Sequence, residues 1–135
     1  MLLSRLESYA RRCLGADSYP RDRHVFKPVS CPTCGVAPLQ LLIEHHTGSR
    51  PDNFRGIARA TCPTCGAQLL VLHFTGPHRK PERNDRPVCP YCRRDRWLLA
   101  ELERYEADLA GFFDEGVLVG RCAECGHLQD LLYTD

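Results

Sequence analysis

Cysteine pairs of the form C-x-x-C occur four times in this chain of 135 residues. Zinc in structural sites is held by four ligands in a tetrahedron, and one C-x-x-C turn supplies two thiolates with the correct bite. Two turns complete one site, so four turns predict two Zn²⁺ ions. The predicted ligands are Cys31, Cys34, Cys62, Cys65, Cys89, Cys92, Cys122 and Cys125.

Disulfide bonding and redox catalysis are the competing uses of such pairs. A disulfide framework needs an oxidising compartment. The start of the chain does not resemble a secretory signal, because Arg5 and Glu7 interrupt any apolar core. We therefore expect a reducing, cytoplasmic location. A redox site needs one pair at the start of a helix, and four pairs are too many for that role.

The residue after each second cysteine supports metal binding. Gly35, Gly66 and Gly126 follow three of the turns, and glycine adopts the positive φ that lets the chain fold under a metal. Arg93 takes this place in the third turn. The third turn is therefore the least regular in sequence, and the sequence defines its geometry least.

An internal repeat indicates which pairs share a metal. The first two turns are separated by 27 residues and the last two by 29. Six residues before the second turn of each half stands a glycine with a β-branched neighbour, Gly56-Ile57 and Gly116-Val117. A duplicated unit most simply folds on its own metal. We assign the first and second turns to one zinc and the third and fourth to the other, with a cross-braced pairing as the alternative.

The two halves resemble zinc ribbons, in which two such knuckles clamp a small antiparallel sheet. The resemblance covers residues 29–76 and 87–135 and implies a small, metal-stabilised, mainly β fold with two tandem four-cysteine ribbons. It says little about function, because zinc ribbons serve many roles. Rubredoxin has similar knuckles that bind iron, so an iron electron carrier is an alternative. The first half lacks that family's acidic, aromatic-rich core.

The chain divides into four segments on this interpretation. Residues 1–28 hold a helix and an extended arm, 29–76 the first ribbon, 77–88 a basic, proline-containing linker, and 89–135 the second ribbon. Apolar residues line one face of a helix expected over 4–14, and this face is expected to pack on the first ribbon. They are Leu3, Leu6, Ala10, Cys13 and Leu14.

Strands are expected near residues 39–45, 55–61, 68–74, 116–121 and 127–133. The stretch between the third and fourth turns is ambiguous. Its apolar residues follow a 4-3-4-3 spacing that favours a helix within 97–112. They are Leu98, Leu102, Tyr105, Leu109 and Phe112.

Charge divides sharply along the chain. Residues 1–96 carry a balance of +8 and residues 97–135 a balance of −7, within a total of +1. The densest basic stretch lies between the ribbons. It could be a solvated linker, or its arginines could form ion pairs with the acidic second ribbon. A third interpretation is a surface that binds phosphates, with an aromatic ring that stacks on a base. The residues of this stretch are Arg79, Lys80, Arg83, Arg86, Arg93, Arg94, Arg96 and Tyr91.

The function predicted from these patterns is a non-enzymatic, zinc-binding adaptor that binds nucleic acid or a nucleoprotein complex. A pure protein–protein scaffold is the alternative, and neither a membrane nor a small-molecule substrate is expected. His45, His46 and Asn53 lie between two knuckles and resemble HNH nucleases. That family needs a helix after the second knuckle, where this sequence indicates a strand.

Overall fold

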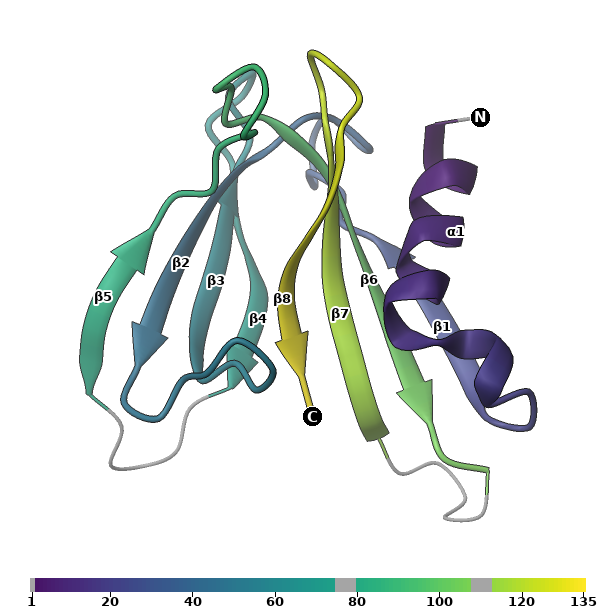
Figure 1. The fold of residues 1–135 in the computed structure, drawn as a ribbon. Coiled ribbons are helices and arrows are strands. Elements are labelled where there is room, and N and C mark those ends of the chain that lie inside the picture. Colours follow the sequence, from purple (N-terminus) through teal and green to yellow (C-terminus); the bar gives the residue numbers. More distant parts are fainter. Residues whose placement is uncertain (1, 75–79, 108–112) are drawn as a thin grey trace.

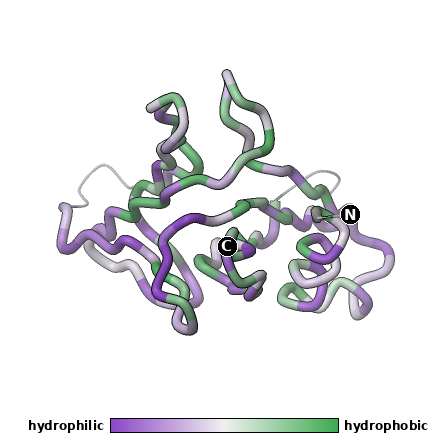
Figure 2. Tube along the Cα trace, turned by 90° about the horizontal axis from the view of Figure 1, so that it is seen from above, coloured by the Kyte–Doolittle hydropathy of each residue, from purple (hydrophilic) through white to green (hydrophobic). Residues whose placement is uncertain are grey.

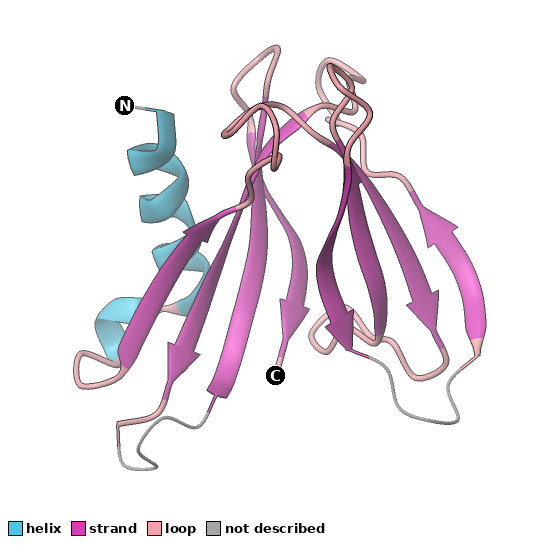
Figure 3. Cartoon of the chain, turned by 180° about the vertical axis from the view of Figure 1, so that it is seen from behind, coloured by secondary structure: helices cyan, strands magenta, loops and turns pink. Residues whose placement is uncertain are grey.

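The structure is a computed structural model of this chain, and it describes residues 2–74, 80–107 and 113–135. Those residues form a mainly β protein with one α-helix (Figure 3), which confirms the predicted fold class. The elements in order are α1 (Leu2–Leu14), η1 (Ala16–Ser18), β1 (Arg23–Pro28), β2 (Gln40–His46), β3 (Gly56–Thr61), β4 (Gln68–Phe74), β5 (Pro81–Asp85), β6 (Trp97–Tyr105), β7 (Phe113–Cys122) and β8 (Leu128–Thr134).

The strands form two antiparallel sheets. One has the order β1-β6-β7-β8 and the other β4-β3-β2-β5. The sheets approach each other at the end where the cysteine turns lie and diverge towards the opposite end (Figure 1). Both pairs of cysteine turns therefore lie at the same end of the molecule.

The duplicated sequence gives duplicated strand pairing. Leu41 pairs with Ala60 in the first half, and Leu99 pairs with Gly120 at the matching place in the second. Even the irregularities agree, because the register shifts after Ala58 in one half and after Leu118 in the other. A β-bulge bends a strand and increases its twist, so the two halves curve alike.

The two halves exchange one strand each, so that each sheet contains a strand from the segment that precedes the other half. β5 precedes the third cysteine turn but pairs with β2 of the first half, where Glu44 lies opposite Asn84. β1 precedes the first cysteine turn but pairs with β6 of the second half, where Phe26 lies opposite Leu102. The segment 77–88, expected to be a linker, thus contains the edge strand β5, which forms the hydrophilic stretch at the left of Figure 2.

Two apolar clusters stabilise this arrangement. The larger one lies between the sheets and joins residues of both halves, including Leu41, Phe54, Trp97 and Leu118. The smaller one lies between α1 and the outer face of the β1-β6-β7-β8 sheet, and it includes Leu6 and Leu102. The helix therefore packs on the second half, so the expectation that it packs on the first ribbon was wrong.

The helix expected within 97–112 is a strand over Trp97–Tyr105, and residues 108–112 lie outside the described residues. β6 is a central strand that pairs with both β1 and β7. Its Trp97 and Leu99 face the inter-sheet core, whereas Ala100 and Leu102 face α1. A strand buried on both faces shows no clean alternation of apolar and polar residues, which is why its apolar spacing also fitted a helix.

Candidate metal centres

The eight paired cysteines come together as two groups of four. One group contains Cys31, Cys34, Cys62 and Cys65, and the other contains Cys89, Cys92, Cys122 and Cys125. Within each group the four sulfur atoms lie within 4.8 Å of one another. The first turn thus joins the second and the third joins the fourth, and the cross-braced arrangement is not formed.

The sulfur separations suit a common metal ion. Sγ of Cys31 lies 3.4 Å from Sγ of Cys65, and Sγ of Cys92 lies 3.4 Å from Sγ of Cys122. A tetrahedron with metal–sulfur bonds of about 2.3 Å places its sulfurs about 3.8 Å apart. A disulfide needs about 2.05 Å, and all nine cysteines of the chain are described and free.

Backbone amides of the turns stabilise negative charge on sulfur. In the first turn the N–H groups of Thr33 and Cys34 donate to Sγ of Cys31 at 3.4 and 3.3 Å. The amide of Cys34, and then that of Thr33, lowers the pKa of the Cys31 thiol. In the second turn, hydrogen bonds from the Cys65 and Thr64 amides lower the pKa of Cys62 to about 6. These thiols are therefore prepared to act as thiolate ligands.

Four thiolates so close together repel one another unless a cation lies between them. The sulfurs of Cys65 and Cys62 raise the pKa of Cys34 to about 12. In a four-cysteine site without a metal, neighbouring sulfurs raise the pKa of one thiol while backbone amides lower the pKa of another. A soft divalent metal ion removes that repulsion, and a four-thiolate tetrahedral donor set suits zinc or iron.

The third turn keeps the geometry of the others although it lacks glycine. Gly35, Gly66 and Gly126 have φ values of 76°, 77° and 80°, and Arg93 has a φ of 65°. Each of these residues donates its N–H to the carbonyl of the first cysteine of its turn, at 2.9 Å for Arg93. The geometry that the sequence left undefined is thus the same as in the other turns, because the backbone tolerates an L-residue there at some energetic cost.

Comparison with family models, with curated proteins and with solved structures finds no significant match to this chain. Within the described residues, no helix is both long enough and apolar enough to cross a membrane.

Cys13 belongs to neither metal group. It lies half-buried on α1 and contacts the smaller apolar cluster, where burial raises the pKa of its thiol. Its sequence-based interpretation as an apolar contact, and not a ligand, agrees with this position.

The histidine pair lies at the end of β2. Nδ1 of His45 is 3.2 Å from Oγ of Ser49, and its Nε2 is 2.7 Å from Oδ2 of Asp85. His46 is buried, with Nε2 2.6 Å from Oε1 of Glu44. The second knuckle leads into the strand β4, as the sequence indicated, so the helix expected of an HNH nuclease is not at this place.

The basic stretch is exposed wherever it is described. Arg79 lies outside the described residues, and the other six basic side chains and Tyr91 are all exposed. Tyr91 is 75% exposed and makes an edge-to-face contact with His127, with ring centroids 4.7 Å apart. Within the described residues, only Arg83 among the six forms an ion pair, with Asp85 on its own strand at 3.4 Å. The interpretation that these residues pair with the acidic second half is not supported there.

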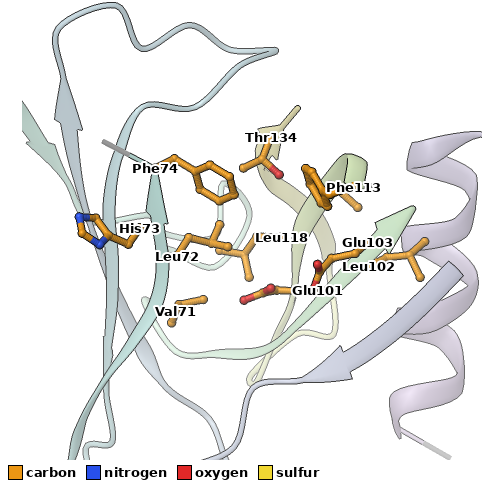
Figure 4. Close-up of a pocket in the computed structure, with 12 residues that line it drawn as sticks. Val71, Leu72, His73, Phe74, Glu101, Leu102, Glu103, Phe113, Leu118 and Thr134 are labelled. Carbon is orange, nitrogen blue, oxygen red and sulfur yellow. The ribbon is translucent and has the colours of Figure 1, made fainter. Parts of the chain in front are cut away.

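The repeat also produces two equivalent clefts between the sheets. In one cleft β8 of the second half faces β2 of the first half, and in the other β4 of the first half faces β6 of the second half. A cleft of about 660 Å³ lies between β2, β5 and β8, and we call it the basic cleft because Arg50, Arg83 and Arg86 line it. A smaller one, of about 250 Å³, lies between β4 and β6–β7 (Figure 4). We call it the acidic pocket because Glu101 and Glu103 line it.

Sequence reasoning missed Arg50 and Glu101 as members of these clefts. Arg50 follows β2 and lines the same cleft as Arg83 and Arg86, since β5 pairs with β2. Glu101 was assigned to a helix and not to a strand that faces the other sheet. Aligning the two halves from their first cysteines would have placed Glu101 opposite the apolar Ile43, because each lies twelve residues after that cysteine.

Proposed function

We propose that this chain is a non-enzymatic, zinc-binding module that binds nucleic acid, alone or in a nucleoprotein complex, through the basic residues of the segment 80–96. The observation that carries this proposal is the exposure of Lys80, Arg86, Arg93, Arg94 and Arg96. Within the described residues none of these five side chains forms an ion pair. Unpaired cations on an ordered surface attract phosphate and release counterions when it binds.

Zinc is the metal that we assign to both centres. A closed four-thiolate site is the usual form of structural zinc. One zinc with four thiolates carries a net charge of about −2, so the metallated chain is slightly acidic overall although its formal charge is +1. Attraction to nucleic acid must therefore come from the local arrangement of basic residues and not from the total charge.

The position of Arg93 supports a role beyond structure. Three of the four turns use glycine where the third uses Arg93 with a φ of 65°. Residues held in sparsely populated backbone conformations cluster at functional sites. Its neighbour Arg94 is also exposed, and Tyr91 in the same turn offers an aromatic face to solvent.

The basic cleft adds a second group of cations. Its two acidic residues are already engaged. Asp130 accepts hydrogen bonds from Tyr9 and Tyr133, at 2.8 and 3.0 Å, and Asp85 contacts His45 and Arg83. Arg50 and Arg86 have no ion-pair partner within the described residues and remain available to a phosphate group.

A pair of charge-matched variants tests the proposal. Replacing Arg86, Arg94 and Arg96 together by Gln should weaken binding to single-stranded RNA or DNA and flatten its salt dependence, by about 0.7 in slope for each lost contact. The matched control replaces Arg5, Arg12 and Arg21, which lie on or beside α1, by Gln. Both variants should keep two zinc ions.

The control should bind as the parent protein does. If both variants weaken binding equally, the attraction is not local and the proposed surface is wrong. If the parent protein binds no nucleic acid at low salt, the proposal fails and the protein–protein scaffold takes its place.

A further inference from the structure

The acidic pocket has one wall from each sheet. Val71, Leu72 and Phe74 of β4 lie on one side, and Leu118 and Phe113 of β7 lie on the other. Figure 4 shows Glu101 extending from β6 towards the side chains of β4, whereas His73 points away from the space. The result is an apolar pocket of about 250 Å³ with a carboxylate inside it.

The carboxylate of Glu101 lies in this pocket without a direct partner. Within the described residues it forms neither a hydrogen bond nor an ion pair. Glu103, the second acidic residue, is already paired, through an ion pair with Lys27 and a hydrogen bond from the hydroxyl of Tyr105 at 2.6 Å. Lys27 lies opposite Glu101 in the register of β1 and β6 and acts on it only through its charge, because the Lys27 ammonium forms its ion pair with Glu103. Among the described residues, the pocket therefore presents one carboxylate without a direct partner and several apolar side chains.

The sister half shows that this carboxylate is not needed for the fold. Ile43 occupies the equivalent place, twelve residues after the first cysteine of its half, and it is buried with 3% exposure in the inter-sheet core. The same strand position thus accepts isoleucine. Burying an ionised carboxylate without a partner is unfavourable. Glu101 therefore makes the fold less stable than an apolar residue would at this position.

The electrostatics of the pocket agree with the geometry. Burial, followed by the charge of Glu103, raises the pKa of Glu101 to about 7, and the charge of Lys27 opposes this rise by a smaller amount. A nearby cation favours the ionised form of a carboxyl group. A cation that enters the pocket would relieve the cost of ionising Glu101.

We propose that the acidic pocket binds an alkylammonium group, with the ammonium on the carboxylate of Glu101 and the apolar stem between Leu72 and Leu118. The stem suits the apolar walls, and the ammonium supplies the missing charge partner. The volume suits one extended side chain or a small aliphatic amine, not a drug-sized ligand, whose pockets begin at about 300 Å³. This site is independent of the nucleic-acid surface.

Butylammonium and butan-1-ol make the decisive pair of probes, because they share a stem and differ in charge. Titrations followed by the amide NMR signals of β4 and β6 should show butylammonium binding and much weaker binding of the alcohol. Glu101→Gln should weaken butylammonium binding by about ten- to a hundredfold. Glu124→Gln, at an exposed position in the fourth knuckle, is the control and should bind as the parent protein does.

Equal binding of the amine and the alcohol would overturn the proposal, because the pocket would then recognise only the apolar stem and not the charge. Unchanged butylammonium binding by Glu101→Gln would overturn it as well. Glu101→Ile is the control for loss of binding through misfolding, because isoleucine occupies the equivalent position in the sister half. It should be folded, at least as stable as the parent protein, and unable to bind the amine.

Two further probes distinguish a free amine from a protein side chain. N-acetyl-lysine methylamide should bind more tightly than butylammonium if the natural ligand is a lysine of another protein, and acetylation of its Nζ should abolish binding. If only the simple amine binds, the ligand is a small molecule. Nucleic-acid binding by Glu101→Gln should be unchanged, so the two proposals fail separately.

Discussion

Leu39 and Trp97 occupy equivalent positions in the two halves and pair with each other. Each lies eight residues after the first cysteine of its half. The N–H of Leu39 donates to the carbonyl of Trp97 at 2.8 Å, and the N–H of Trp97 donates to the carbonyl of Leu39 at 2.9 Å. Both side chains are fully buried. An approximate two-fold axis of the molecule therefore passes between them, and the halves meet where each one leaves its first knuckle.

Metal content is the most direct prediction. Protein purified without added metal should carry two zinc ions per chain, measured by elemental analysis. Removing them with a chelator should unfold the chain, because structural zinc in small modules contributes about 10–16 kcal/mol of apparent binding energy. One metal per chain, or iron in both centres, would contradict the prediction.

The two centres should be coupled. The sequence repeat suggested that each half folds on its own metal, but the inter-sheet core includes Cys31 and Cys62 of one centre together with Cys89 and Cys122 of the other. Cys65→Ser should therefore lose the first metal and also lower hydrogen-exchange protection in β6 and β7. Full protection in those strands would show that the halves are independent after all.

Arg93→Gly should stabilise the protein. Glycine adopts a φ of 65° without the cost of about 1 kcal/mol that an L-residue incurs. Chemical denaturation at fixed zinc concentration should show a gain of this size, and nucleic-acid binding should weaken. Arg94→Gly is the matched control, since it removes the same charge from the next exposed position and should give no gain in stability.

Gly56→Ala should disrupt the first sheet. A Cβ at this position would lie 1.9 Å from the carbonyl oxygen of Glu44 on the neighbouring strand, and φ is +150°. We expect a loss above ~3 kcal/mol, since the paired backbone must move. Gly15→Ala is the control, because its φ is +61° but nothing lies within 4 Å of the added carbon. It should lose only about 1 kcal/mol.

Glu101 should make stability fall between acidic and neutral pH. Its folded-state pKa is raised from 4.5 to about 7, so the folded chain binds a proton more tightly than the unfolded chain. The proton stabilises the fold fully below pH 4.5, and this contribution is lost as the pH rises through 7. The penalty above pH 7 is at most ~3 kcal/mol.

Other groups in the protein also titrate in this range, so the difference between two proteins isolates Glu101. The parent protein and Glu101→Gln should be compared by thermal unfolding from pH 5 to 8. The advantage of the variant should grow with pH. A constant difference would mean that Glu101 titrates normally. Glu103 and Lys27 lie close by and are shared by both proteins.

The parts of the fold that follow from short-range patterns were predictable. The grouping of the cysteine turns follows from the repeat, and the strands β3, β4 and β8 follow apolar runs next to a knuckle. β6 was not predictable by its spacing, because Trp97 and Leu98 are both buried on opposite faces of one strand. The exchange of β1 and β5 was not predictable either, since an edge strand carries no local mark of its partner. Arg50 became visible as a cleft residue only once the pairing of β5 with β2 was known, whereas Glu101 required β6 to be recognised as a strand.

The exchanged strand β1 has a consequence for the order in which the protein can fold as it leaves the ribosome. Phe26 is made long before its partner Leu102, and at typical elongation rates the delay is roughly 4–15 s. During that time α1 and β1 lack the sheet on which they pack, although the ligands of the first metal centre are already complete by Cys65. The newly made chain thus exposes the apolar face of its first helix until its last third emerges, and this interval is when a chaperone would protect it from aggregation.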